Sequence, residues 1–144
     1  MPTSASAPLS IALVDTSVAV PLVLADHDAH DATVDAVRGI RLGLAGHAWF
    51  ETYSVLTRLP PGLRRSPATV RAILDSDFPE TCFPDATMVA SLGAEIADLG
   101  IAGGAVYDAL VGASARAFRL PLLSRDKRAR ATYESLGVDV RFIG

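Results

Sequence analysis

The sequence contains very little of several residue types, and each shortage excludes a class of protein or site. Its single cysteine, Cys82, rules out an internal disulfide and a metal site built from thiolates. Its net charge is −3, so no overall positive field favours nucleic acid or a membrane surface. No apolar run approaches the roughly 18 residues that a membrane-spanning helix needs. These absences predict a reducing, cytoplasmic setting without membrane contact.

The first ten residues, MPTSASAPLS, carry neither the positive charge nor the apolar core of a secretory signal. We expect residues 1–10 to form a flexible lead-in and residues 11–144 to fold as a single domain. Half of the chain is hydrophobic, which is enough apolar material to bury a core in a domain of this size.

Strand-like apolar runs alternate with helix-like segments, a pattern typical of βαβ units and a mostly parallel sheet. The expected strands are residues 11–14, 40–45, 81–83, 120–124 and 138–144. The expected helices are a short segment after residue 16, then 26–38, 47–59, 66–74, 86–99, 103–118 and 125–137. The chain is therefore predicted to be one α/β domain.

Four acidic residues stand in apolar or strand-terminal settings where an acid is unusual. Asp15 follows the strand IALV, Glu51 lies early in an aromatic-rich helix, Asp108 interrupts the apolar run AVYDALVGA, and Asp126 follows the strand LPLLS. Burying an ionised carboxylate without a partner is costly. Asp15 taken alone is slightly better explained as a cap of the next helix, so its interpretation depends on whether the other acids converge on it.

The expected topology brings these acids together. In a parallel sheet, the strand ends and the starts of the following helices lie at the same edge. We therefore expect the four carboxylates to project into one crevice, where each raises the pKa values of its neighbours. One or two Mg²⁺ or Mn²⁺ ions would relieve this repulsion, because hard cations prefer oxygen ligands.

Four segments in this order, VDTSV, ETYSVLTRLP, GGAVYDALV and LLSRDKRA, resemble the PIN-domain ribonucleases, specifically the VapC-like toxins of bacterial toxin–antitoxin pairs. The resemblance spans residues 11–143. It implies a PIN-like α/β/α sandwich with a central, mostly parallel sheet of four to five strands. It also implies an acidic tetrad formed by Asp15, Glu51, Asp108 and Asp126.

The activity implied by the resemblance is metal-dependent hydrolysis of RNA phosphodiester bonds, with Mg²⁺ as the cofactor and Mn²⁺ as its substitute. A water whose pKa is lowered by the metal would attack phosphorus in line. Asp15 and Asp108 are the first candidates for direct metal ligands. Glu51 and Asp126 would complete the coordination or position the nucleophile.

Hydroxyl and basic side chains near the acids have expected supporting roles. The hydroxyls of Thr16, Ser17 and Ser124 are expected to donate hydrogen bonds within the site. The segment SRDKRAR carries four basic residues that either hold the phosphates of the substrate or form a solvated helix face. These residues are Arg125, Lys127, Arg128 and Arg130.

The aromatic residues near the acids are expected to be structural. Trp49, Phe50 and Tyr53 are interpreted as core or dimer contacts in preference to base-stacking platforms. Tyr107, beside Asp108, is open to either role, and core packing is the favoured one.

The resemblance also implies partners. They are an RNA substrate of the tRNA or ribosomal RNA class, a cognate VapB-like antitoxin, and a second copy of the chain in a homodimer. Two other functions stay open from the sequence: a non-catalytic PIN-derived module that binds a metal or a partner, and an aspartyl-nucleophile phosphatase. The phosphatase is the weaker alternative, because Ser17 stands where such enzymes carry a second aspartate.

Overall fold

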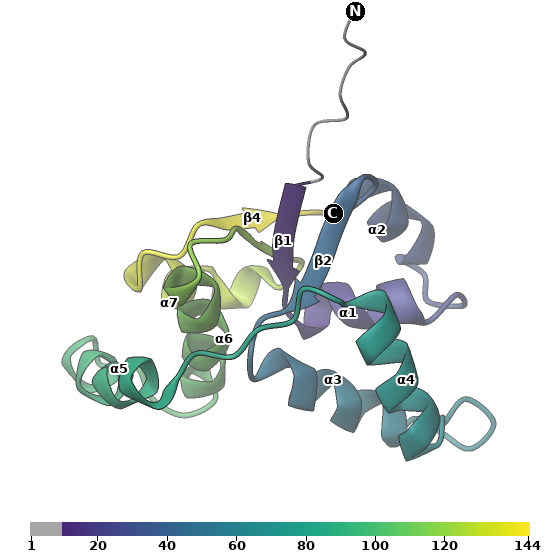
Figure 1. Cartoon of the computed structure of the whole chain (residues 1–144), viewed down its shortest axis with the longest axis horizontal. Helices are drawn as coiled ribbons and strands as arrows, with labels where there is room; N and C mark the ends of the chain where they lie inside the picture. The colour runs from purple at the N-terminus through teal and green to yellow at the C-terminus, as the bar shows by residue number, and fades with distance from the viewer. Residues whose placement is uncertain (1–9) are drawn as a thin grey trace, which may run out of the picture.

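A parallel sheet of four strands forms the centre of the structure (Figure 1). The computed structural model describes residues 10–144, so the predicted flexible lead-in lies outside the described residues except for Ser10, which begins the first strand. The strands are β1 (Ser10–Val14), β2 (Ile40–Leu44), β3 (Leu122–Ser124) and β4 (Val140–Phe142), in the spatial order β2-β1-β3-β4. All neighbouring pairs are parallel.

Helices pack on both sides of this sheet, as the predicted α/β/α sandwich requires. They are α1 (Thr16–Val23), α2 (His30–Ala36), α3 (Ala48–Thr57), α4 (Pro67–Asp77), α5 (Ala86–Asp98), α6 (Ala105–Ala117) and α7 (Arg130–Ser135), with a 3₁₀ turn, η1 (Lys127–Ala129), before the last. In Figure 1, α1 to α4 gather on one side of the strands and α5 to α7 on the other. In the contacts between elements, α1 meets α2 and α3, and α6 meets α5 and α7.

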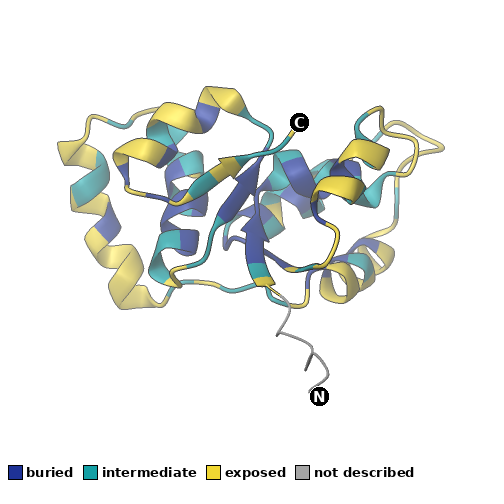
Figure 2. Cartoon of the chain, turned by 90° about the horizontal axis from the view of Figure 1, so that it is seen from above, coloured by how far each residue is buried: buried dark blue, intermediate teal, exposed yellow. Residues whose placement is uncertain are grey.

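The two inner strands are buried, because their apolar residues face helices on both sides. Leu13 pairs with Leu122, and Val14 lies between Leu44 of β2 and Leu123 of β3. Figure 2 shows these strands as the buried centre of the molecule, whereas α5 lies at its edge and is largely exposed. The core therefore holds the carboxyl ends of β1 and β3 in a fixed position.

The strand order creates a topological switch point between β1 and β3. After β1 the chain crosses to β2 on one side, and it later returns to form β3 on the other side. Crossovers that leave in opposite directions open a crevice at the carboxyl ends of the two strands, where α/β proteins bind ligands.

The predicted strand 81–83 is not a strand of the sheet; it forms one isolated bridge, between Cys82 and Ala45. Its backbone still bonds to β2, because the N–H of Cys82 donates to the carbonyl of Leu44 at 3.4 Å. The N–H of Leu44, however, donates to the Thr81 hydroxyl at 2.9 Å in place of a ladder carbonyl, so the regular ladder does not extend to this segment.

Two predicted helices are shorter than expected. The helix expected over 26–38 begins only at His30, because the N–H of Ala29 bonds to the His27 ring at 3.0 Å within a preceding turn. The helix expected over 125–137 opens as the 3₁₀ turn η1, where the Asp126 carboxylate accepts the N–H of Arg128. Among residues 10–144, no helix is long and apolar enough to cross a membrane.

Candidate functional site

Asp15 lies between β1 and α1, with only 5% of its surface exposed. Its carboxylate accepts no backbone N–H from the first turn of α1, so the cap interpretation does not describe what the side chain does. Three hydroxyls donate to it instead: Ser17 Oγ to Oδ1, Ser124 Oγ to Oδ2 at 2.6 Å, and Tyr133 OH to Oδ2 at 2.9 Å. These donors come from α1, β3 and α7, so the fold fixes the orientation of this carboxylate.

Ser17 and Ser124 also tie the segment after β3 to Asp15. The Ser17 hydroxyl accepts the N–H of Arg125 at 2.8 Å, and the Ser124 hydroxyl accepts the N–H of Asp126 at 3.1 Å. Each serine therefore donates to Asp15 and accepts one backbone N–H from the segment that leads to Asp126. The ends of β1 and β3 are held together through these two side chains.

Thr16 has a different position from the one predicted. Its hydroxyl lies 3.2 Å from that of Thr52, and it also donates to the carbonyl of Ala48 at 3.5 Å. Thr16 thus joins α1 to α3, and among the hydrogen bonds of residues 10–144 it makes none to Asp15.

Glu51 and Asp108 lie in the first turns of α3 and α6. Burial raises the pKa of Glu51 to about 7, and the charges of Asp108 and Asp15 add to this effect. Burial likewise raises the pKa of Asp108, with further contributions from Asp126 and Asp15. Neighbouring carboxylates therefore make Glu51 and Asp108 harder to ionise, which places acids from four separate segments in one electrostatic cluster.

Asp126 caps η1 and pairs with Arg128, whose Nε lies 3.2 Å from Oδ1. The Asp126 charge raises the pKa values of both Asp15 and Asp108. For Asp15, burial is the main cause of the raised pKa, and the three hydroxyl donors oppose it. The structure thus brings together all four predicted acids at the carboxyl ends of the strands.

This cluster has the chemistry of a site for a hard divalent cation. Its side chains offer carboxylate oxygens, and three of the four carboxylates have raised pKa values that a nearby positive charge would lower. In the part of the chain that the structure describes, no three acidic, histidine or cysteine side chains lie close enough to hold a metal ion in their present positions. The donor set thus fits the cation through its oxygen chemistry and its electrostatics, while its present spacing does not form a closed coordination shell.

The four basic residues predicted near Asp126 do not share one environment. They are Arg125, Lys127, Arg128 and Arg130. The Arg128 side chain is 93% exposed beside the acidic cluster. Arg130 instead lies 4.3 Å above the ring of Phe142 and 3.5 Å from the Glu134 carboxylate. Arg128 therefore extends into solvent while its Nε pairs with Asp126, whereas Arg130 packs on the Phe142 ring.

Tyr133 is the site residue that the sequence did not indicate. The segment ATYESLG has the pattern of a polar surface helix, yet the Tyr133 ring is 1% exposed. A Cβ on Gly112 of α6 would lie 2.8 Å from Cδ1 of this ring. The pairing of a helical glycine with a tyrosine on the next helix was the available signal, but only the fold shows that the two residues meet.

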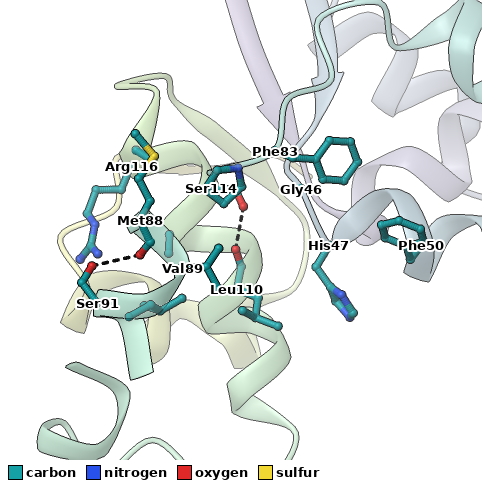
Figure 3. A pocket seen from close by; sticks show the side chains of 14 residues that line it. Gly46, His47, Phe50, Phe83, Met88, Val89, Ser91, Leu110, Ser114 and Arg116 are labelled. Carbon is teal, nitrogen blue, oxygen red and sulfur yellow. Dashed lines mark hydrogen bonds between the residues drawn. The ribbon is translucent and has the colours of Figure 1, made fainter. Parts of the chain in front are cut away.

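An apolar pocket lies beside the carboxylates, between α3, α5 and α6. Figure 3 shows His47 and Phe50 on one side of it and Val89 and Leu110 on the other, with Phe83 near its rim. Several of its side chains are exposed, including Phe50 and Phe83. Apolar surface gathered in this way is typical of contact with another macromolecule.

Comparisons with known proteins agree with this geometry. The family profile of the PIN domain matches residues 12–135. The chain is 45% identical over 127 residues to Ribonuclease VapC27 of Mycobacterium tuberculosis, covering 88% of this chain and 93% of that protein. It is also 45% identical over 131 residues to Ribonuclease VapC40 of the same organism, covering 90% and 96% of the two proteins.

A solved structure supports the fold alone. The crystal structure of VapBC2 from Rickettsia felis bound to a DNA fragment from their promoter matches with a TM-score of 0.66 and 14% identity, covering 93% of this chain and 99% of that chain.

By the family profile and the two identities of 45%, the chain belongs to the PIN-domain family, and within it to the VapC ribonuclease toxins of VapBC toxin–antitoxin systems. Ribonucleases of this family are generally metal-dependent.

Proposed function

We propose that this chain is an endoribonuclease that uses Mg²⁺, with Mn²⁺ as a substitute, at Asp15, Glu51, Asp108 and Asp126. The observation that carries the proposal is the convergence of acids that follow β1 and open α3 and α6, where burial and the charges of neighbouring carboxylates raise the pKa values of Asp15, Glu51 and Asp108. A protein does not gain stability from such an arrangement of acids alone. A bound divalent cation makes the arrangement of acids favourable, because its positive charge offsets the repulsion between the carboxylates.

When bound, the metal supplies a water of lowered pKa and positive charge for the phosphate oxygens. The chain's own residues hold the carboxylates in place and accept a proton from the attacking water. Asp15, held by three hydroxyls, presents its carboxylate in one orientation. The Glu51 carboxylate, in the first turn of α3 beside the other acids, would accept a proton from the attacking water.

The basic residues beside Asp126 have unequal roles in this proposal. Arg128, together with Arg125 and Lys127, contacts the substrate's phosphates, since these side chains surround the end of β3 next to the carboxylates. Arg130 contributes mainly to the packing of α7 on β4 through Phe142.

The partners follow from the family. We propose a tRNA or ribosomal RNA substrate, a cytoplasmic location, and inhibition by a cognate VapB-like antitoxin. We also propose a homodimer whose contact includes the exposed apolar side chains Phe50, Phe83, Met88 and Val89 around the pocket of Figure 3. Burying large exposed apolar side chains under a partner lowers the free energy of the complex.

The test is cleavage of total cellular RNA by the purified chain, free of antitoxin, with Mg²⁺ or Mn²⁺. Discrete fragments are expected, and they should disappear with EDTA and in the variants Asp15→Asn and Asp108→Asn. Asp98→Asn, a change at an exposed acid at the end of α5, is the matched control and should cleave normally. Cleavage that persists in both site variants would overturn the assignment of the acids.

A further inference from the structure

Tyr107 occupies a place that its expected core role does not explain. It lies in the first turn of α6, directly before Asp108, and 53% of its surface is exposed. The prediction that it packs in the core is therefore wrong. An exposed tyrosine ring next to a cluster of carboxylates requires another explanation.

The Tyr107 ring is held in place by one neighbour. It stacks on the His47 ring with centroids 5.3 Å apart and an angle of 21° between the planes. His47 in turn lies beside the acids, because its Nε2 is 3.8 Å from Oε1 of Glu51. The two rings, one from α3 and one from α6, thus form an aromatic wall along the acidic cluster.

We propose that Tyr107, backed by His47, is a stacking platform for an unpaired nucleobase of the RNA substrate. The inference rests on the proposed function and names one part of its substrate site. Single-stranded RNA is recognised largely by stacking of splayed bases on aromatic side chains, and any base has a face that can stack. A ring already held by a second ring binds a base with little further loss of side-chain freedom.

The position of the platform suits a base adjoining the scissile phosphate. His47 contacts Glu51, and Tyr107 is next to Asp108 in the sequence, so both rings adjoin residues that we assign to the reaction. A base stacked there is attached to a phosphate at the carboxylates by a short stretch of backbone. The platform therefore selects unpaired nucleotides over paired ones, because a base within a duplex cannot reach it.

Other exposed aromatic residues do not share this geometry. Phe50 and Phe83 tilt at 55° to one another, with centroids 5.9 Å apart, and both line the apolar pocket (Figure 3). We assign that pocket to a protein contact. Tyr107 does not line it.

The experiment is a double-mutant cycle between the tyrosine and one base. A short single-stranded RNA carries either 2-aminopurine or an abasic residue at one position, moved along the strand in a series. Fluorescence titrations with the full chain are made in EDTA, and again with Ca²⁺. The variants are Tyr107→Leu, Tyr107→Phe and, as the matched control, Phe118→Leu, which removes an exposed ring at the other end of α6.

Stacking predicts that the wild-type chain quenches 2-aminopurine at one position, and that Tyr107→Leu removes the quenching and weakens binding about tenfold. The same variant should bind the abasic RNA as the wild type does. Tyr107→Phe, which keeps the ring, should behave like the wild type, and so should Phe118→Leu.

Two results would overturn the proposal. One is equal affinity of wild type and Tyr107→Leu for the 2-aminopurine RNA. The other is a change of oligomeric state in Tyr107→Leu by light scattering with unchanged quenching, which would assign the ring to an interface between copies. Failure of the wild-type chain to cleave any RNA would instead contradict the proposed function, so the two failures are distinguishable.

Discussion

The hydroxyl of Tyr133 donates a hydrogen bond of 2.9 Å to Oδ2 of Asp15, joining residues 118 positions apart in the sequence. The bond is buried, and Asp15 has two further hydroxyl donors, Ser17 and Ser124. The carboxylate raises the pKa of the phenol in return, after the larger effect of burial, so this hydroxyl keeps its proton. Tyr133 is therefore a permanent donor that helps to hold Asp15 in one orientation.

The variant Tyr133→Phe removes this donor and keeps the ring. The pKa of Asp15 should rise further, because one of the bonds that lower it is lost. We expect Mn²⁺ affinity at neutral pH to fall about tenfold, a usual cost of losing a residue that orients a metal ligand. Calorimetric titration measures this, with Tyr53→Phe as the matched control on α3. Equal affinity in wild type and Tyr133→Phe would show that the bond does not orient Asp15.

The stability of the metal-free chain should fall as pH rises. Asp15, Glu51 and Asp108 all have folded pKa values above their ordinary values. The folded state therefore binds more protons than the unfolded state between those two values, and the free energy of unfolding decreases with pH across this window. For Glu51 the window runs from 4.5 to about 7. Below this window Glu51 is protonated in both states and does not destabilise the fold. Above the window Glu51 is ionised in both states, and its full cost to the free energy of unfolding is present.

Thermal unfolding in EDTA from pH 4.5 to 8 tests this sign. The melting temperature should decrease with pH, and Glu51→Gln should flatten the decrease, whereas Asp98→Asn should keep it. Adding Mn²⁺ should raise the melting temperature more at pH 8 than at pH 5, since protons compete with the metal at low pH. A melting temperature that rises with pH in EDTA would contradict the interpretation.

Arg128 and Arg130 should respond differently to substitution by alanine. Arg128→Ala should weaken RNA binding and reduce the slope of log affinity against log salt by about one, because it removes the exposed side chain that we propose as a phosphate contact. Arg130→Ala should leave the slope nearly unchanged and lower stability by about 1 kcal/mol, because it removes the contact with Phe142. Filter binding at several salt concentrations and denaturant unfolding separate the two effects. Identical slopes for both variants would contradict the distinction.

Two glycine-to-alanine changes should have opposite effects on stability. Gly112→Ala places a methyl group 2.8 Å from the Tyr133 ring and 3.0 Å from Val138, and should cost about 1–3 kcal/mol. Gly93→Ala lies in open space within α5 and should stabilise the chain by about 0.5–1 kcal/mol. Urea unfolding of both variants checks the pair. If Gly112→Ala were as stable as the wild type, the close packing of α6 against Tyr133 would be wrong.

The sequence predicted the sheet edge where the acids meet, because each acid stands at a strand end or in the first turn of a helix. Those positions follow from local patterns, as for Asp15 after IALV and Asp108 within AVYDALVGA. The metal-binding and catalytic roles of the acids stay predictions. The sequence did not identify which hydroxyls reach Asp15: Thr16 and Ser17 are adjacent, yet only Ser17 does.

The remaining differences also depend on packing between distant segments. The sequence pattern places Tyr133 on the surface, but in the fold it is buried against Gly112 of α6. The pattern places Tyr107 in the core, but in the fold its side chain is exposed. The spacing of apolar residues along a helix or strand predicts which of its faces is buried. It does not predict which residue of a distant segment an individual aromatic ring contacts.

The strand order has a consequence for the chain as it is being made. Because β3 begins at Leu122 and pairs with β1, Asp15 has neither Ser124 nor Tyr133 until the ribosome has made this later segment. Asp126 is absent until the same point. A growing chain therefore lacks the complete acidic cluster until the segment from β3 to α7 emerges, which delays the assembly of the site relative to its first acids.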